Sequence, residues 1–377
     1  MVKKFVKSVQ IDTKQIFKNA NVSPENLLFF DIETTGLSRA KNHVCIVGFG
    51  KIKGDVLTVT QFISESSSDE PELLFALKNE YSADLTTVTF NGTRFDLPFV
   101  NERMAQNNIE FSFDEGTCYD LYKEIKDFAG SLALSDCRQQ TLELFLHTGR
   151  KDSTDGRQLV KNYKVYSSTG NPDLENAVLL HNFEDIKGLV LLFELFSVKK
   201  KYEDLKSTLD ITDISVKSNK YKDMNGFDCD EILVDFNLNK SLINPVTLTA
   251  KSLFIKAEAD SGIASIRFFK GNMKYFFKDY KNYFYLPEEG TCIHKDLAKF
   301  VDANHKEKAK PHNCFAEKNS CFIPVLCENI KYKDKQLPVF RSDYMSVDSY
   351  IEADENMLND MTFLKVYLLS NILNNLS

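Results

Sequence analysis

Two carboxylates stand one residue apart at the end of an apolar run, in the stretch Leu28–Glu33. Side chains alternate between the two faces of a strand, so Asp31 and Glu33 point the same way if this run is a strand. Neighbouring carboxylates repel each other unless a cation or a shared proton holds them. The pair therefore indicates a divalent-metal site, although two solvated acids at a strand end are also common.

Two further acids stand where they could complete such a site. Asp96 falls in the first turn of an expected helix, and Asp185 falls on a later, longer one. Four carboxylates from separate elements can hold two divalent cations roughly 3.5–4 Å apart, which activate a water and stabilise the leaving oxygen in phosphodiester cleavage. Mg²⁺ and Mn²⁺ prefer hard oxygen ligands of this kind. The four acids together predict a two-metal centre.

A histidine accompanies the last acid. His181 lies four residues before Asp185, so the two side chains share one helix face. Because its unperturbed pKa lies near neutrality, His181 could orient or deprotonate the attacking water. A hydrogen-bonded structural histidine fits the same pattern, so the role of His181 stays open at this point.

The elements that must position these residues alternate between strands and helices. A three-strand meander followed by β–α alternation predicts an α/β fold with a mixed five-stranded sheet flanked by helices. Asn171 and Pro172 are expected to begin the long helix that carries His181 and Asp185. Besides the strand with Asp31, the pattern predicts strands at 43–50, 56–62, 86–90 and 117–119, and helices at 70–81, 94–107, from 120 onward, and 171–196.

Composition limits the class of protein. The 377 residues suggest two domains, and 43% hydrophobic with 27% charged residues is ordinary for a soluble globular chain. A net charge of −7 argues against coating nucleic acid by bulk charge, but it leaves room for a local basic groove. Eight cysteines without a CxxC pair indicate reduced thiols, and no stretch is apolar enough for a signal peptide or a membrane span. A cytoplasmic protein without a membrane partner is expected.

The chain is expected to divide into a lead-in arm over residues 1–26, an α/β domain over 27–202 and a β-rich accessory domain over 203–377. In the last part the pattern predicts strands at 232–238, 248–258 and 283–286, helices at 294–301 and 357–376, and a hairpin over 266–277 that turns near Gly271-Asn272. Residues 267–281 interleave Arg and Lys with Phe and Tyr. This segment could form a platform for single-stranded nucleic acid, but a sheet with solvated lysines is the favoured interpretation.

Cysteine and histidine residues in the second half also raise the question of zinc. Their spacings match no established zinc finger or ribbon, so isolated thiols and surface histidines are favoured. The residues are Cys292, His294, His312, Cys314, Cys321 and Cys327.

Three motifs occur in a fixed order along the first half: Asp31-Ile32-Glu33-Thr34-Thr35-Gly36-Leu37, Asn91-Gly92-Thr93-Arg94-Phe95-Asp96 and His181-Asn182-Phe183-Glu184-Asp185. In this order they resemble the DEDD (DnaQ-like) 3′–5′ exonucleases of the ribonuclease-H-like superfamily. The chain is most similar to the YprB-like branch, with supporting matches at Asp120-Leu121-Tyr122 and Gln140-Thr141-Leu142-Glu143. The resemblance covers about residues 25–200.

The resemblance implies a ribonuclease-H-like fold and a role for each matching residue. Asp31, Glu33, Asp96 and Asp185 would bind two Mg²⁺ or Mn²⁺ ions. Thr34 and Leu37 would contact the terminal nucleotide, while Asn91 and Phe95 would shape the pocket and the path of the strand. The histidine form of the family has its base five residues before the last Asp, and the tyrosine form four; here His181 stands at the tyrosine spacing.

The implied activity is hydrolysis of single-stranded DNA or RNA from the 3′ end. A nucleic-acid-binding module without turnover and an endonuclease of the same fold are the alternatives. Structural roles are favoured for two other acids. Asp120 could touch a metal, but capping the helix that follows it is favoured; Asp155 could close the site from its loop, but a turn position is favoured. The choice between DNA and RNA is not predicted.

Overall fold

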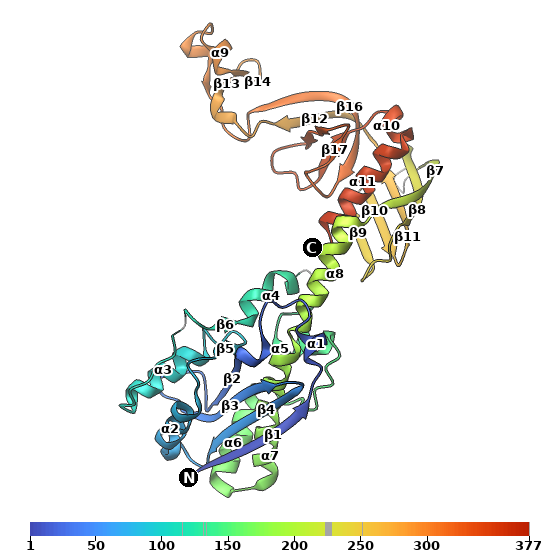
Figure 1. Ribbon diagram of the computed structural model, residues 1–377. Coiled ribbons are helices and arrows are strands. Elements are labelled where there is room, and N and C mark those ends of the chain that lie inside the picture. Colours follow the sequence, from blue (N-terminus) through green and yellow to red (C-terminus); the bar gives the residue numbers. More distant parts are fainter. Residues whose placement is uncertain (115, 131, 133, 223–227, 251, 377) are drawn as a thin grey trace. The chain divides into compact units, whose positions relative to one another are not determined.

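The computed structural model describes residues 1–114, 116–130, 132, 134–222, 228–250 and 252–376. The chain forms two compact units, Met1–Lys201 and Tyr202–Ser377 (Figure 1). Each unit has its own hydrophobic core. No helix in the described part of the chain combines the length and apolar character needed to cross a membrane.

The first unit is built on a mixed six-stranded sheet in the order β1-β4-β3-β2-β5-β6. The pairs β1/β4, β4/β3 and β3/β2 are antiparallel, while β2/β5 and β5/β6 are parallel. The predicted α/β class with a ribonuclease-H-like mixed sheet is confirmed. The strands are β1 (Val2–Gln10), β2 (Leu27–Thr34), β3 (Val44–Lys53), β4 (Val56–Ser64), β5 (Thr86–Thr89) and β6 (Tyr119–Asp120).

The sheet has six strands where five were expected, because the first residues of the chain are part of it. Residues 1–26, expected as a lead-in arm, contain β1, which pairs with β4 from Val2↔Ser64 to Gln10↔Val56. Lysines along β1 obscured its pattern: Lys3 forms ion pairs with Glu65 and Glu175, while Phe5 packs on the core beneath. An edge strand tolerates such charges on its open side.

Helices cover both faces of this sheet (Figure 1). On one face, Leu28, Phe30 and Ile32 of β2 pack with α2 and α3. The intervening residues of β2, including Asp31 and Glu33, turn to the other face, where α7 contacts β2, β3 and β4. The helices are α1 (Thr13–Ile16), α2 (Glu70–Glu80), α3 (Asp96–Gln106), α4 (Leu121–Gly130), α5 (Gln139–Phe145), α6 (Gly156–Thr169) and α7 (Pro172–Leu191), with short 3₁₀ turns at Pro24–Asn26 and Ser67–Asp69. Helix α8 (Glu194–Thr208) begins in the first unit, and its residues from Tyr202 onward belong to the second.

Helix α7 begins as predicted, with Pro172 in its first turn and the Asn171 side chain accepting a hydrogen bond from the Asp173 amide. It lies close to β3 because the strand carries glycine beneath it. A Cβ on Gly48 would lie 2.3 Å from Oδ1 of Asn182, and a Cβ on Gly50 would lie 2.7 Å from Cγ2 of Ile186. Any larger side chain on β3 at these positions would push the helix outward.

The second unit contains a five-stranded antiparallel sheet in the order β7-β8-β11-β10-β9. Its core includes Ile255 and Ile266 from the sheet and Phe363, Tyr367 and Ile372 from the last helix. The strand expected over 248–258 is two antiparallel strands on either side of residue 251, which lies outside the described residues. The elements are β7 (Ile211–Lys222), β8 (Asp228–Leu238), β9 (Val246–Ala250), β10 (Leu253–Glu258), β11 (Ser261–Arg267), α10 (Glu355–Asn359) and α11 (Met361–Asn374).

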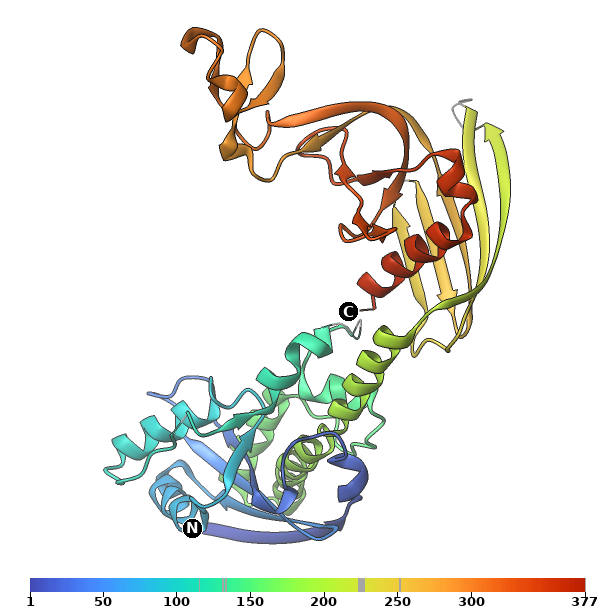
Figure 2. The same ribbon diagram turned by 45° about the horizontal axis from the view of Figure 1, so that its top comes forward.

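Two smaller sheets follow, with the orders β12-β16-β20-β19 and β14-β13-β15. The three-stranded sheet lies at the end of β12 and β16 that is distant from the five-stranded sheet (Figure 2). The elements are β12 (Phe269–Phe276), β13 (Tyr283–Leu286), β14 (Thr291–His294), β15 (Glu307–Lys308), β16 (Phe315–Val325), β19 (Val339–Phe340) and β20 (Ser349–Glu352), with the pair β17 (Lys331–Tyr332) and β18 (Lys335–Gln336), α9 (Lys295–Ala298), and 3₁₀ turns at Tyr280–Asn282 and Ala303–His305.

The hairpin expected over residues 266–277 is wrong. Gly271 and Asn272 do not turn the chain; they lie inside β12 and pair with Ser320 and Asn319 of β16. Strand β11 instead pairs with β8 and β10. The partner of β12 is therefore remote in sequence, and no local pattern identifies it.

The close packing of α7 on β3 leads to a prediction. Replacing Gly48 with alanine should lower the free energy of unfolding by about 1–3 kcal/mol, the usual cost of overpacking. Asn182 is fully buried and bonded on both sides, so it cannot move aside without losing those bonds. Urea unfolding of the Gly48→Ala variant measures the loss. Gly156→Ala is the control, because a Cβ there meets nothing within 4 Å; equal stability of the two variants would contradict the prediction.

Candidate metal-binding site

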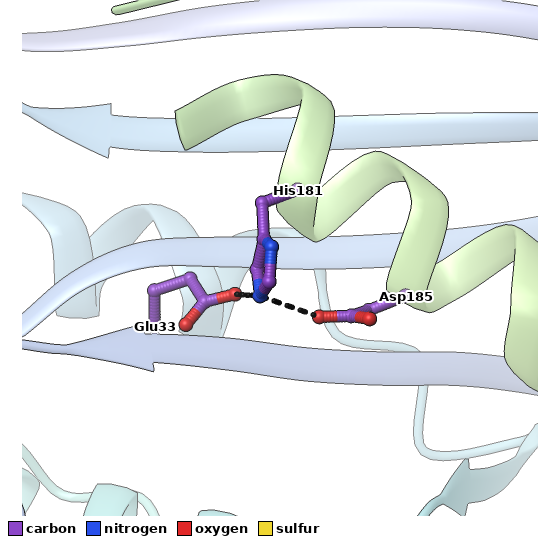
Figure 3. A group of neighbouring side chains, drawn as sticks. All are labelled: Glu33, His181 and Asp185. Carbon is purple, nitrogen blue, oxygen red and sulfur yellow. Dashed lines mark ion pairs between the residues drawn. The ribbon is translucent and has the colours of Figure 1, made fainter. Parts of the chain in front are cut away.

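Three side chains from β2 and α7 converge on one point. The ligand atoms of Glu33, His181 and Asp185 all lie within 4.8 Å of one another, an arrangement that could hold a metal ion. Nε2 of His181 is 3.3 Å from Oδ2 of Asp185 and 3.8 Å from Oε1 of Glu33. Figure 3 shows the imidazole extending from the helix between the two carboxylates. The group is largely buried, with the His181 side chain only 7% exposed.

Asp31 lies beside this group and is held by a buried amide. Asp31, Gly48 and Gln61 face one another across three neighbouring strands. Nδ2 of Asn182 donates to Oδ2 of Asp31 at 2.8 Å, and Nε2 of Gln61 donates to Oδ1 of Asn182 at 2.9 Å. Nε2 of Gln61 also donates to the carbonyl of Leu179 at 2.8 Å. Asn182 of α7 thus connects the helix to Asp31 by a hydrogen bond, and its side chain occupies the space above Gly48.

Asp96 is the first residue of α3 and is buried. Burial raises its pKa to about 7, with the neighbouring charges of Asp120 and Asp185 adding to the effect and backbone hydrogen bonds opposing it. The carboxylate of Asp96 in turn raises the pKa values of Asp31 and Glu33. All four predicted acids therefore act on one another, although the group whose ligand atoms lie within 4.8 Å contains only Glu33 and Asp185 among them.

The acids of β2 are in an unfavourable state without a cation. Burial raises the pKa of Asp31 well above its usual value, followed by the charges of Asp185 and Asp96. Burial likewise raises the pKa of Glu33, followed by the charges of Asp31, Asp185 and Asp96. Clustered buried carboxylates are costly unless they are protonated or share a cation. Their oxygens are the donors that Mg²⁺ and Mn²⁺ prefer, so the residues present fit a hard divalent cation.

The side chain of Arg150 places a positive charge next to these acids. Nη1 of Arg150 is 2.7 Å from Oδ1 of Asp185 and 3.2 Å from Oε2 of Glu143, and Nη2 is 3.2 Å from Oδ2 of Asp152. Burial would lower the pKa of Arg150, but Asp185 and Glu143 outweigh it and the pKa is raised. Arg150 thus compensates part of the negative charge from the side of α7 that faces the loop 146–155.

Asp152 fixes the ring of His181. Nδ1 of His181 lies 2.5 Å from Oδ2 of Asp152. If Nδ1 carries the proton, it donates to Asp152, and the lone pair of Nε2 points at Glu33 and Asp185. His181 is therefore oriented by one acid and directed at two others.

The residues expected to contact nucleic acid lie around the acids without joining the three-residue group. Thr34 donates its hydroxyl to the Gly36 carbonyl at 2.9 Å, and Leu37 is 84% exposed on the loop after β2. Asn91 has a positive φ of 61° in the turn before α3, and the ring of Phe95 lies 5.5 Å from that of Phe99. Leu37 has the exposure that a substrate contact requires.

Two other acids have structural roles. Asp120, expected to cap the helix after it, instead accepts hydrogen bonds from the Asn91 amide at 2.8 Å and the Thr93 hydroxyl at 2.6 Å. It therefore holds the loop that leads into Asp96. Asp155, expected in a turn, caps α6 by accepting a hydrogen bond from the Gln158 amide at 2.8 Å.

Sequence reasoning missed Arg150 and Asp152 as members of the site. Glu143 was noted only as part of a supporting match, yet it is buried against α7 at Gly188, where a Cβ would lie 1.9 Å from its Oε1. The available signal was the Arg-x-Asp sequence Arg150-Lys151-Asp152 in a loop between two helices. This pair of opposite charges reaches the acidic centre, because Arg150 binds Asp185 and Asp152 binds His181.

Comparison with known proteins supports the ribonuclease-H-like class of the first unit. Residues 28–197 match the family model RNase_H_2, described as RNase_H superfamily. This range includes all four acids and His181. The match and the mixed sheet together identify the first unit as ribonuclease-H-like.

A solved structure titled "ExoI/SSB-Ct complex" is similar at 12% sequence identity and a TM-score of 0.28. The alignment covers 62% of this chain and 55% of that chain, so it spans little more than half of the other protein. The comparison with curated proteins found no match.

The raised pKa of Asp96 predicts how metal-free stability responds to pH. The folded state binds the proton of Asp96 more tightly than the unfolded state does, so this residue lowers stability as the pH rises from about 4 to about 7. The Asp96→Asn variant should therefore gain stability relative to wild type between about pH 5 and about pH 8, by on the order of 2–3 kcal/mol at about 1.4 kcal/mol per pKa unit. Urea unfolding in EDTA measures the difference.

Asp84→Asn is the control for this experiment. Hydrogen bonding to Ser82 lowers the pKa of the exposed Asp84, so its carboxylate is ionised at both pH values. Its relative stability should not change with pH. If Asp96→Asn behaves like Asp84→Asn, the carboxyl of Asp96 does not experience the buried environment described above.

Proposed function

We propose that the first unit is a metal-dependent 3′–5′ exonuclease, a hydrolase that cleaves phosphodiester bonds of single-stranded DNA or RNA. The observation that carries the proposal is the buried group Glu33–His181–Asp185 with Asp31 and Asp96 beside it, on a ribonuclease-H-like sheet. The four acids come from β2, α3 and α7, and burial together with their mutual repulsion raises the pKa values of Asp31, Glu33 and Asp96. Apolar residues in their places would avoid this cost, so a purely structural role does not account for the group. The DEDD sequence pattern supports the exonuclease form within the superfamily.

Asp31, Glu33, Asp96 and Asp185 would hold two Mg²⁺ or Mn²⁺ ions. When bound, such ions supply a nucleophilic water and stabilise the charge on the leaving oxygen. The chain's own contribution is to fix the acids in place: Asn182 orients Asp31, and Asp120 holds the loop before Asp96.

His181 is the proposed proton acceptor. With the Nδ1 proton held by Asp152, Nε2 of His181 is free to take a proton from the attacking water. The ring points at the acids, so the proton is removed where the water would be bound. Arg150, paired with Asp185, is positioned to balance charge that builds up on the phosphate.

Thr34 and Leu37 are the proposed contacts of the terminal nucleotide, with Asn91 and Phe95 shaping the pocket. Leu37 is exposed and lies three residues after the end of β2, close in sequence to both acids of that strand. The second unit would serve as an accessory domain, and the cytoplasmic location inferred from the cysteines remains a prediction.

A nucleic-acid-binding module without turnover is the second candidate. The observation in its favour is Arg150, which already neutralises Asp185 and could satisfy the site without a metal ion. An endonuclease of the same fold is a further variant of the enzyme.

Single-stranded oligonucleotides labelled at one end distinguish these functions. With Mn²⁺, a 5′-labelled strand of DNA or RNA should shorten step by step, and a 3′-labelled strand should release a labelled mononucleotide first. EDTA or Asp31→Asn should stop the reaction, with a rate loss of about 100-fold or more for the variant. A circular single strand should stay intact; its cleavage would indicate an endonuclease. Absence of any metal-dependent product from all of these strands would overturn the enzyme proposal.

Asp152 is predicted to act through His181. Asp152→Asn should lower kcat about 10–100-fold, the usual effect of removing a partner that orients a site residue, with little change in KM. Asp155→Asn is a matched control three residues away, because asparagine also caps a helix well. Steady-state kinetics on a labelled oligonucleotide tests both variants, and equal activity of the two would exclude the orienting role.

A further inference from the structure

Positive charge is concentrated in one part of an acidic chain. Residues 267–341 contain fifteen Lys and Arg but nine Asp and Glu, whereas the whole protein has a net charge of −7. This segment forms β12 to β19 of the second unit. A local positive region of this kind attracts a polyanion even when the protein as a whole is negative.

A groove with a volume of about 610 Å³ lies in this segment. Its walls come from the end of β12 and the residues after it, and from the stretch 336–344 around β19. Aromatic rings dominate the lining: Tyr275, Phe276, Phe277, Tyr280 and Tyr344. The volume falls in the range typical of ligand sites.

These rings are not buried as core residues. Tyr344 is 40% exposed, and the other four aromatic residues of the groove are partly exposed. The core of the same sheet is formed by Met273, Phe322, Phe340 and Tyr350, and Tyr275 of the groove packs against it. The ring of Phe276 meets that of Tyr344 edge to face at 5.4 Å. Phe276 also meets Phe315 edge to face at 5.5 Å. In an edge-to-face contact only one of the two rings has a face covered, so the partly exposed side of each ring can still meet a base.

Two cations share one acid in the groove. Nζ of Lys278 is 3.5 Å from Oε2 of Glu328, and Nη2 of Arg341 is 3.1 Å from Oε1 of Glu328. The Lys278 side chain is 90% exposed. Exposed ion pairs of this type contribute little to stability, so a phosphate can replace Glu328 at little cost. The three side chains leave one positive charge in excess.

We propose that this groove binds single-stranded nucleic acid, with bases stacked on the rings of Phe276 and Tyr344 and phosphates paired with Lys278 and Arg341. Single strands are bound by this combination, because every base has a π face and every nucleotide carries a phosphate. A duplex hides its base faces, and an acidic peptide would use the cations but not the rings. The site goes beyond the proposed activity, since binding here needs no catalytic group of the first unit.

Fluorescence anisotropy of the full-length protein tests the groove. Labelled oligothymidylate and oligouridylate are titrated in EDTA, so binding is measured without hydrolysis. Tyr344→Ala should weaken binding about 5–150-fold, corresponding to roughly 1–3 kcal/mol for one stacked base. Lys278→Ala should weaken binding and reduce the slope of log affinity against log salt by about one.

The chain offers matched controls just after α9. Phe300 is 88% exposed, and Lys299 is 70% exposed and paired with Asp296 much as Lys278 is paired with Glu328. Phe300→Ala and Lys299→Ala should bind like wild type. All four residues are exposed, so unchanged melting temperatures are expected and verify that each variant is folded.

Binding that is the same for Tyr344→Ala and Phe300→Ala would overturn the proposal. Equal competition by a duplex of the same length or by polyglutamate would also overturn it, because charge alone would then explain binding. The result is separable from the proposed activity. If the wild-type protein hydrolyses no strand but Tyr344→Ala binds more weakly, the groove is supported and the exonuclease proposal is rejected. If the wild-type protein hydrolyses the strand but Tyr344→Ala binds like wild type, the exonuclease proposal is supported and the groove is rejected.

Discussion

The arrangement of the first unit depends on how closely α7 approaches β3. Gly48 lies between Asp31 and Gln61 in the sheet, and the space above it is occupied by the side chain of Asn182. The amide bonds to both neighbours, which fixes the depth and the rotation of the helix at once. A buried amide whose donor and acceptor are both satisfied rigidifies its surroundings, whereas an unsatisfied one would be costly. His181 and Asp185 reach Glu33 because this contact sets the helix in place.

A second close approach on α7 brings charge to the site. Glu143 of α5 lies against Gly188, and Arg150 connects Glu143 with Asp185. The carboxylates of β2 and α7 and the guanidinium of the loop therefore form one electrostatic unit. Burial, followed by the charges of the neighbouring acids, raises the pKa values of Asp31 and Glu33, and Arg150 opposes part of this effect.

The fold class and the candidate acids could be predicted because their signals are local. The alternation on β2 assigns Asp31 and Glu33 to one face, and the four-residue spacing assigns His181 and Asp185 to one helix face. Arg150 and Asp152 could not be found in this way, since they lie in a loop without periodicity and their partners Asp185 and His181 are about thirty residues away. Strand β1 was hidden by its lysines, and β12 was mistaken for a hairpin because a Gly-Asn pair usually marks a turn. In each case the structure depends on a contact between residues far apart in the sequence, which a local pattern does not reveal.

Arg150 has a consequence for the site before a metal ion is bound. Many small metal domains stay unfolded until the ion arrives, because the free energy of metal binding supplies much of their free energy of folding. Here a cation encoded in the chain reaches Asp185, Asp152 and Glu143 as soon as the helices pack. The first unit thus carries an internal cation for these acids before any ion is bound. A divalent ion held by the proposed acids would compete with Arg150 for Asp185 and would leave the guanidinium available to an anion in the site.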